Sequence, residues 1–492
     1  MGDRPLGRAG FASRDRRGGR VSSWGKPKAQ NLPDISLHPL GNLIDSLDNS
    51  SLDLAVCTTS RSSSITDCKY VTSYNWLNEK TPTIMVPGRP PLWTPLDEPR
   101  RLNEDRGNYF RDPNAARFPE YPTEPSIQAL FTYKPEFPTS SVDLFACGST
   151  MGNLLRFVRS IDKPFRFGVE VVGNTVFFVR KENSPDELID GVRGFGHTFP
   201  ETYTTWEKEV KGSDTHQRVI QYHFGGLNCL VRFESDGYLG NLTADNDTLK
   251  GEPNTPLDED GLAKAFEAVS VYHPYAATSN LTLKTGGSEV LQQSIFDLKT
   301  RSGKWGKQID ISEQLPALWV KQIPNFIVAY HDGEGRFEKD KIQTHDVRKD
   351  IQQWETENKA ALKRLAALLR KIIDFAKASH QGMIEVYRYS IDRLEIRTQF
   401  DTGTHALPLS LRNRWASNSA PGSKVPDIPS PIANALRKMA EQNDNDGTNS
   451  DADFGDGFTH ILPGKSLYED NDDLDFTACS AEDCGYCGRC SY

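Results

Sequence analysis

The stretch VIQYHFGGLNCLVRFESDGYL, residues 219–239, decides the fold. Two runs rich in β-branched and aromatic residues flank Gly225 and Gly226, which is the pattern of a β-hairpin. The second run ends in Glu234 and Asp236. Because strand side chains alternate between the two faces, residues two apart share a face. We therefore expect both carboxylates on one face, roughly 7 Å apart along the strand.

A second charged strand is predicted downstream in SIFDLKTRS, residues 294–302, where Asp297 and Lys299 also share a face. Carboxylates from two strands suit a hard divalent cation, Mg²⁺ or Mn²⁺, which completes its shell with water and phosphate. A lysine beside the metal can hold a phosphate oxygen or the attacking water. The chemistry that such a site permits is metal-assisted phosphodiester hydrolysis. The alternative is a solvated face with simple ion pairs; the apolar flanks count toward a metal site, because buried charges are costly unless paired, and both interpretations stay open at this point.

Other strands and helices are predicted around these two motifs. Strand patterns occupy 165–181, 325–338, 384–390 and 393–400, and helix patterns occupy 149–159, 314–322 and 346–379. This order predicts an α+β fold, with a mixed β-sheet core and flanking helices, over residues 71–415. Within it we expect 71–125 to be an ordered irregular wrap and 240–290 to be an insertion between core strands.

Composition limits the function classes. The chain has 492 residues, with 58 Lys and Arg against 67 Asp and Glu, a net charge of −9. A uniformly basic nucleic-acid binder is excluded, so any basic site must be local. No uncharged apolar run approaches the roughly 18 residues that cross a bilayer. The start has arginines without an apolar core, unlike a secretory signal. We expect no membrane partner and a nuclear and/or cytoplasmic location.

Three terminal regions are predicted to lie outside the core. Residues 1–70 read as a disordered basic arm, which serves either RNA binding and nuclear import or only solvation. Residues 416–475 read as a disordered acidic linker, and 476–492 form a Cys-rich tail. The cysteines of this tail are Cys479, Cys484, Cys487 and Cys490. Thiolates at this density bind Zn²⁺, although their close spacing leaves free thiols for docking or redox chemistry as the alternative.

The order of the motifs from about 142 to 380 resembles the DXO decapping and exoribonuclease family, which has a PD-(D/E)XK-like nuclease fold. That family shows a strand ending in Glu-x-Asp and then a strand with Glu-Leu-Lys-Thr. A Trp-x-x-Gln type segment and an Ile-Val-Ala-Gly-Phe-like strand follow. This chain has FESDGY, DLKTRS and LWVKQIPNFIVAYHDGEG in that order, and VDLFACGSTMGNLLRF resembles the family's first helix.

The resemblance implies roles for five residues. Glu234, Asp236 and Asp297 match metal ligands or their water-mediated helpers, and Lys299 and Gln322 match residues that position the phosphate or the nucleophile. It also implies a Mg²⁺- or Mn²⁺-dependent hydrolase of RNA 5′ ends, acting by decapping, pyrophosphohydrolysis or 5′–3′ degradation. RNA would be its partner, together with a protein of RNA processing.

One departure from the family's pattern leaves two hypotheses open. Val179 and Arg180 stand where the family has an earlier acid. In a two-residue hairpin Glu170 pairs with Phe177 and shares the face of Val179, so Glu170 could supply the missing metal ligand. Alternatively, Arg180 occupies the site as a permanent cation, and the chain is an inactive nuclease fold that binds RNA or serves as a scaffold.

Overall fold

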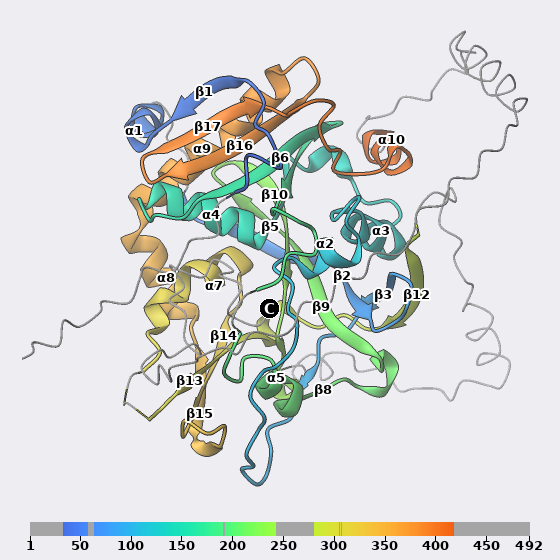
Figure 1. The fold of residues 1–492 in the computed structure, drawn as a ribbon, viewed down its shortest axis with the longest axis vertical. Helices are drawn as coiled ribbons and strands as arrows, with labels where there is room; N and C mark the ends of the chain where they lie inside the picture. The colour runs from blue at the N-terminus through green and yellow to red at the C-terminus, as the bar shows by residue number, and fades with distance from the viewer. Residues whose placement is uncertain are drawn as a thin grey trace, which may run out of the picture.

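The computed structural model describes residues 33–57, 63–189, 192–242, 280–304, 306 and 308–417. The strands of these ranges form two sheets, with helices packed on both sides of the larger one (Figure 1). The predicted α+β architecture, a mixed sheet with flanking helices, is confirmed. None of the helices in these ranges has both the length and the apolarity needed to cross a lipid bilayer.

The larger sheet contains both parallel and antiparallel pairs. In spatial order its strands are β1 (Leu43–Leu47), β17 (Arg393–Thr398), β16 (Met383–Ser390), β6 (Phe165–Val172), β7 (Thr175–Arg180), β5 (Leu144–Cys147), β10 (Leu227–Glu234), β9 (Ser213–Phe224), β2 (Thr66–Leu77), β3 (Thr83–Gly88) and β12 (Thr282–Gly287). The hairpins predicted around Gly173 and around Gly225 are confirmed as β6–β7 and β9–β10. Both glycines have positive φ, which their tight turns require.

The smaller sheet lies below the larger one in Figure 1. In spatial order its strands are β15 (Phe337–Asp346), β14 (Asn325–His331), β13 (Ile295–Ser302), β11 (Gly237–Tyr238), β4 (Leu92–Trp93) and β8 (Thr204–Thr205). The strand β11 begins three residues after β10 ends, so the chain passes from one sheet to the other there. The Glu-x-Asp motif lies at this crossing.

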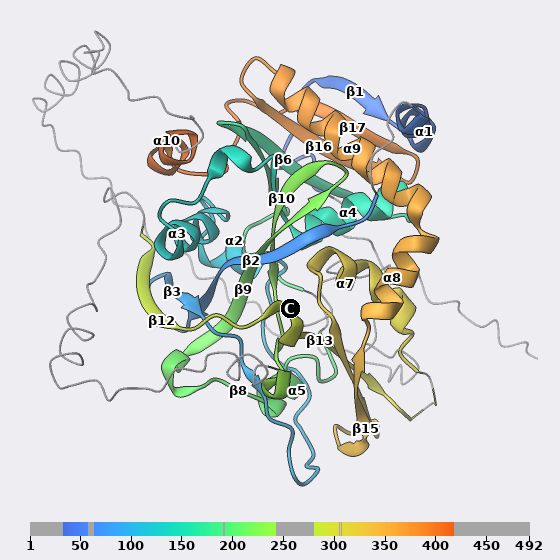
Figure 2. The ribbon, with the colours of Figure 1, turned by 180° about the vertical axis from the view of Figure 1, so that it is seen from behind.

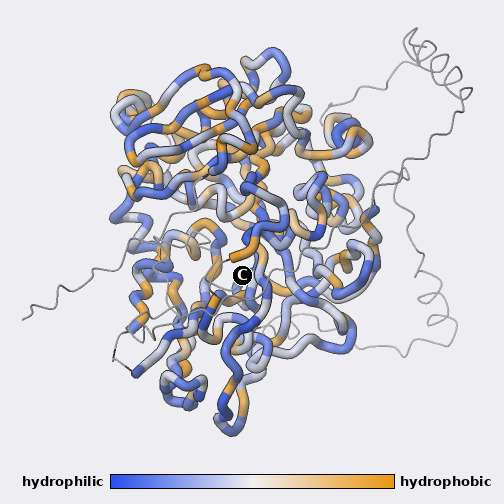
Figure 3. The backbone as a smooth tube through the Cα atoms, in the orientation of Figure 1, coloured by the Kyte–Doolittle hydropathy of each residue, from blue (hydrophilic) through white to orange (hydrophobic). Residues whose placement is uncertain are grey.

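Helices pack on both sheets. They are α1 (Asn49–Cys57), α2 (Pro113–Arg117), α3 (Glu124–Tyr133), α4 (Gly148–Val158), α5 (Thr198–Tyr203), α7 (Leu315–Lys321), α8 (Arg348–Glu357), α9 (Lys359–Ala378) and α10 (Leu409–Ser417). The main core joins α4, α7 and α9 to one face, and a second cluster joins α3 and α10 to the other (Figure 2). In Figure 3 hydrophobic and hydrophilic segments alternate along most of the chain, as expected where elements bury one face.

Part of the segment 1–70, expected to be disordered, is ordered, which corrects that prediction. The strand β1 pairs with β17, and α1 packs near α9. Leu47 and Leu52 are fully buried. A segment with few apolar residues can fold here because it docks on a surface that the rest of the sheet supplies. Residues 1–32 and 58–62 lie outside the described residues.

Two further expectations are corrected. The helix predicted over 346–379 is divided at Asn358 into α8 and α9, and Asp346 ends β15, where its Oδ1 accepts a hydrogen bond from the amide of Arg348 at the start of α8. The stretch 71–125 is irregular over much of its length, as expected, but it also includes most of β2 and all of β3, β4 and α2. Its apolar residues alternate on strands that pack on α3, a pattern hidden by the many prolines nearby. Most of the predicted insertion lies outside the described residues.

Candidate functional site

The pairing of β11 with β13 brings two aspartates together. Gly237 is the partner of Phe296 in this antiparallel pair, so Asp236 lies beside Asp297. The backbone amide of Leu298 donates a hydrogen bond to Asp236 Oδ2 at 2.7 Å. The expectation that the Glu-x-Asp pair shares one strand is therefore corrected, since β10 ends before Asp236. The prediction that the Glu-x-Asp and Asp-x-Lys strands meet is confirmed for this aspartate pair.

Asp297 is buried, Asp236 is half-buried, and the ammonium group of Lys321 lies against Asp297. Burial and the neighbouring carboxylate of Asp297 raise the pKa of Asp236 well above its usual range. The Nζ atom of Lys321 lies 2.8 Å from Asp297 Oδ2 and partly offsets this effect. The other oxygen, Asp297 Oδ1, is buried and has no hydrogen-bond partner. Two adjacent carboxylates with an unused oxygen fit one hard divalent cation that keeps several waters.

No group of three or more His, Cys, Asp or Glu side chains in the described ranges has the geometry of a metal site. A cation held by Asp236 and Asp297 would therefore need water and substrate oxygens to complete its coordination. Mg²⁺ is commonly bound in this way, by one or two carboxylates and by phosphates. The donor set fits a metal that binds together with its substrate.

Glu234 stands at the end of β10, beside the crossing. Its Oε2 accepts a hydrogen bond from Gln217 Nε2 at 2.9 Å. Burial raises the pKa of Glu234 to about 7, although Gln217, Lys321 and Arg232 act in the opposite direction. A carboxyl group that titrates near neutral pH can accept or donate a proton in catalysis.

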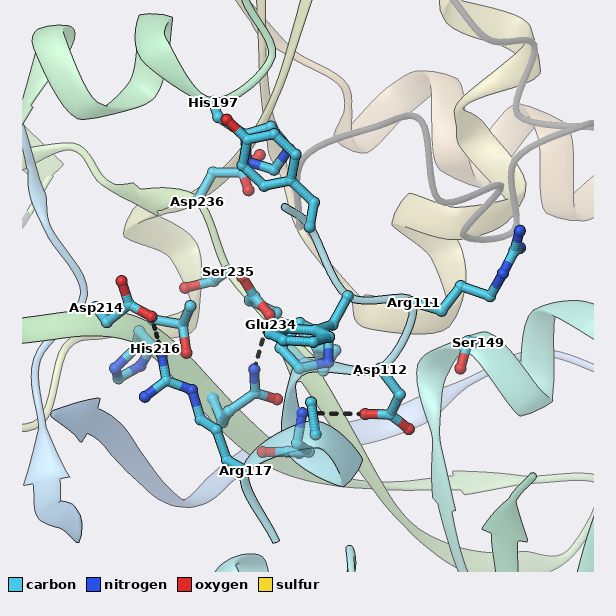
Figure 4. Close-up of a pocket in the computed structure, with 18 of the residues that line it drawn as sticks. Arg111, Asp112, Arg117, Ser149, His197, Asp214, His216, Glu234, Ser235 and Asp236 are labelled. Carbon is cyan, nitrogen blue, oxygen red and sulfur yellow. Dashed lines mark hydrogen bonds and ion pairs between the residues drawn. The ribbon is translucent and has the colours of Figure 1, made fainter. Parts of the chain in front are cut away.

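A cavity of about 470 Å³ opens beside these carboxyl groups (Figure 4). Glu234 and Asp236 lie on one wall, and the stacked rings of Tyr109 and His197 lie near Asp236. Arginines and the beginning of α4 complete the lining. Acidic and basic walls that face one cavity suit a phosphate ester bound through a cation on one side and through guanidinium groups on the other.

The predicted positioning residues occupy different places. Lys299 is buried on the same face of β13 as Asp297, as the spacing predicts. Gln322 ends α7 with a positive φ of 52°, and its side-chain Nε2 donates to Trp319 O at 2.5 Å. The preceding residue, Lys321, contacts Asp297, and the sequence analysis missed it. A lysine in the last turn of an apolar helix is the signal that could have identified it.

Glu170 is not brought into this cluster. It pairs with Phe177, as the hairpin predicts, but its carboxylate lies on the face that α10 covers. Its Oε1 lies 2.7 Å from His405 Nδ1 and 2.9 Å from Arg412 Nη1, and its Oε2 accepts from the amide of Ala406. The structure thus contradicts the proposed metal role of Glu170, because the segment after β17 supplies its partners.

Arg180 takes the position of the missing acid at the cavity. Its Nε lies 2.6 Å from Glu182 Oε1 and 3.9 Å from Asp112 Oδ2. The neighbouring Val179 packs against an apolar cluster. A cation therefore lines the cavity where the family's pattern has a carboxylate. The predicted zinc ligands of the tail lie outside the described residues.

A family model described as "Domain of unknown function (DUF8563)" matches residues 53–414. No curated protein matches the chain. Among solved structures, Rai1 of Scheffersomyces stipitis, crystallised with (3'-NADP)+ and calcium ion, matches with 12% identity and a TM-score of 0.44, over 73% of this chain and 98% of that chain. Candida albicans Rai1 in complex with pU5-Mn2+ matches with 11% identity and a TM-score of 0.43, over 76% and 99%.

Dxo1 of K. lactis in complex with manganese matches with 10% identity and a TM-score of 0.40, over 75% of this chain and 98% of that chain. Rai1 and Dxo1 are proteins of the DXO family, which is the family that the motif order of this chain resembles. At these identities the similarity is one of fold alone. Since all three TM-scores lie below 0.5, the roles assigned below rest on the side chains of this chain.

Proposed function

We propose that this chain, which belongs to the family described as a domain of unknown function (DUF8563), is a divalent-metal-dependent hydrolase of RNA 5′ ends. Decapping, removal of pyrophosphate and 5′–3′ degradation are the reactions this proposal covers. The supporting observation is the pair of Asp236 and Asp297, in which Asp297 has one unused oxygen and Asp236 lines a cavity that also has arginines in its lining.

The side chains at this site would have separate roles in the reaction. A cation held by Asp236 and Asp297 would supply Lewis-acid activation of a phosphoryl oxygen and of water. Lys321 keeps the negative charge of this pair in place by its contact with Asp297. Glu234, with its pKa of about 7, is suited to accept a proton from the attacking water. The arginines of the opposite wall would hold phosphate oxygens and orient the chain end.

A second candidate function is RNA-end binding without hydrolysis. Arg180 favours it, because a permanent cation lines the cavity at the position of an acid in the family's pattern. Such a protein would bind RNA ends, or hold them for a partner in RNA processing, without needing a metal. The two candidates differ in one measurable respect, which is turnover that depends on a divalent cation.

The test uses the full-length chain with RNA that carries a 5′-triphosphate, a cap or a 5′-monophosphate. We expect product release with Mn²⁺ or Mg²⁺, none with EDTA, and at least a hundredfold loss in Asp236→Asn, since removing one charged group of a metal site typically costs this much. Equal cleavage by the wild type and Asp236→Asn would reject the hydrolase. Metal-independent RNA binding without cleavage would support the second candidate.

A further inference from the structure

The beginning of α4 forms part of the cavity wall. Cys147 ends β5 and is the N-cap of α4, yet its side chain caps no backbone amide. Instead its Sγ lies 3.1 Å from the hydroxyl groups of Ser149 and Thr150. Cys147, Gly148 and Ser149 all line the cavity. A helix N-terminus has unsatisfied amide groups and a partial positive charge, which attract anions.

An independent observation at the same place is the guanidinium of Arg232. This residue is the direct partner of Cys147 in the β5–β10 pair and lines the same cavity. Its side chain is nine-tenths buried, at 9% exposure, and its Nη1 has no hydrogen-bond partner. A buried guanidinium N–H without an acceptor is costly. An anion in the cavity would supply the acceptor that the protein does not.

The charged residues around the N-terminus of α4 determine which ligands can bind there. Arg180 lies close to Arg232, and Asp112 lies close to both. Asp112 is occupied in part by capping α2, since its Oδ1 accepts from two amides there. Arg180 is paired with Glu182. Arg232 is therefore a cation here that still has an unused hydrogen-bond donor. Its positive charge and the partial positive charge at the N-terminus of α4 act on the same part of the cavity.

The N-terminus of α4 and Arg232 lie next to Asp236 and Asp297, but the two groups have no residue in common. A Cβ placed on Gly148 would lie 3.8 Å from Cγ of Lys321, the lysine that binds Asp297. The stem of Lys321 thus separates the α4 N-terminus from the carboxylates. A ligand with two linked anionic groups could place one on each side of this lysine.

We propose that the N-terminus of α4 and the guanidinium of Arg232 form a phosphate-binding subsite that takes the terminal phosphate of an RNA 5′ end. The inference rests on the proposed function for its ligand class, but the subsite works without a divalent cation. It would favour 5′-phosphorylated ends over 5′-hydroxyl ends. It would also hold the outermost phosphate while the next phosphate lies near Asp236 and Asp297.

The experiment measures binding by fluorescence anisotropy in EDTA. Full-length protein is titrated with two RNA oligonucleotides of one sequence, one with a 5′-triphosphate and one with a 5′-hydroxyl. We expect about tenfold tighter binding of the phosphorylated RNA, as for one or two charge-assisted hydrogen bonds. Arg232→Met should remove most of this preference, and Arg232→Lys should keep part of it.

Ser149 provides a second variant that does not depend on a buried arginine. Ser149→Asp places a negative charge at the helix N-terminus, where it favours the helix, so the variant should fold and yet repel phosphate. Ser149→Asn is the matched neutral control and should retain the preference within about twofold. Thermal unfolding of each variant checks the fold. A wild type without preference, or a preference that persists in both Arg232→Met and Ser149→Asp, would overturn the subsite.

The outcomes separate this inference from the proposed hydrolase. Asp236→Asn should lose hydrolysis and still prefer the phosphorylated RNA in EDTA. If the wild type shows no hydrolysis but its preference depends on Arg232, the hydrolase is rejected and the subsite stands. If hydrolysis occurs without any preference in EDTA, the hydrolase stands and the subsite is rejected.

Discussion

Asp236 lies beside Asp297, although Asp236 stands in the link between β10 and β11 and Asp297 stands in β13, far along the chain. Burial and this neighbouring carboxylate raise the pKa of Asp236 well above its usual range. The nearby ammonium group of Lys321 compensates in part, and Asp297 Oδ1 remains without a partner. A divalent cation at the proposed site would therefore offset the like-charge contact that Lys321 compensates only in part.

The first prediction concerns metal-linked stability. Addition of Mn²⁺ should raise the melting temperature of the wild type, because a ligand that binds only the folded state stabilises it, by about 2.7 kcal/mol at a hundredfold excess over Kd. Asp297→Asn should lose this Mn²⁺ shift, and it should also melt lower than the wild type in EDTA, because it leaves the buried ammonium of Lys321 without its carboxylate. Differential scanning calorimetry measures both. A full Mn²⁺ shift in Asp297→Asn would contradict a metal at this pair.

The second prediction follows from the pKa of Glu234, which burial raises to about 7. The folded state binds this proton more tightly than the unfolded state, so the group stabilises the fold at low pH, and this contribution is lost as pH rises from about 4.5 to 7. Urea unfolding of wild type and Glu234→Gln should show the variant gaining about 1–3 kcal/mol relative to the wild type between pH 4.5 and 8. A difference in unfolding free energy between the two proteins that does not change with pH would contradict the raised pKa of Glu234.

The third prediction distinguishes the two lysines near the pair. Lys321→Met should lower hydrolysis at least tenfold and shift its pH dependence upward, because losing the ammonium raises the pKa of Asp236 further. Lys299→Met is the comparison, because Lys299 shares the β13 face with Asp297. The pH profiles of both variants are measured with saturating Mn²⁺. A larger upward shift of the pH profile in Lys299→Met than in Lys321→Met would show that Lys299, and not Lys321, has the larger effect on the ionisation of this site.

Local periodicity predicted the strands and the shared face of Asp297 and Lys299, because alternation along a strand depends only on neighbouring residues. It could not predict that β10 ends at Glu234 and that the chain then changes sheets, since this depends on pairing with a strand far along the chain. The order of motifs nevertheless indicated that Asp236 and Asp297 meet.

The errors have a common physical origin in tertiary contacts. Glu170 has the expected register, but its partners come from a segment after β17 that carries no motif. Gln322 has the expected spacing, but helix α7 ends there in a left-handed turn that directs its amide to Trp319. Side-chain direction at a helix end depends on how the helix stops, which spacing alone does not determine.

The fourth prediction tests the placement of Glu170. Glu170→Gln should destabilise the fold by about 3–5 kcal/mol, the usual cost of removing one partner of a buried ion pair, because Arg412 would lose its carboxylate. It should also expose α10 to limited proteolysis. The Mn²⁺ shift in melting temperature should remain, since Glu170 lies outside the aspartate cluster.

Arg412→Met is the matched control for this prediction. It removes the other partner of the same contact, so it should produce the same proteolytic fragment and likewise keep the Mn²⁺ shift. The two single losses should not add in the double variant, because residues in one ion-pair network couple. Loss of the Mn²⁺ shift in Glu170→Gln but not in Arg412→Met would show that Glu170 is a metal ligand after all, since only a ligand would separate the two variants.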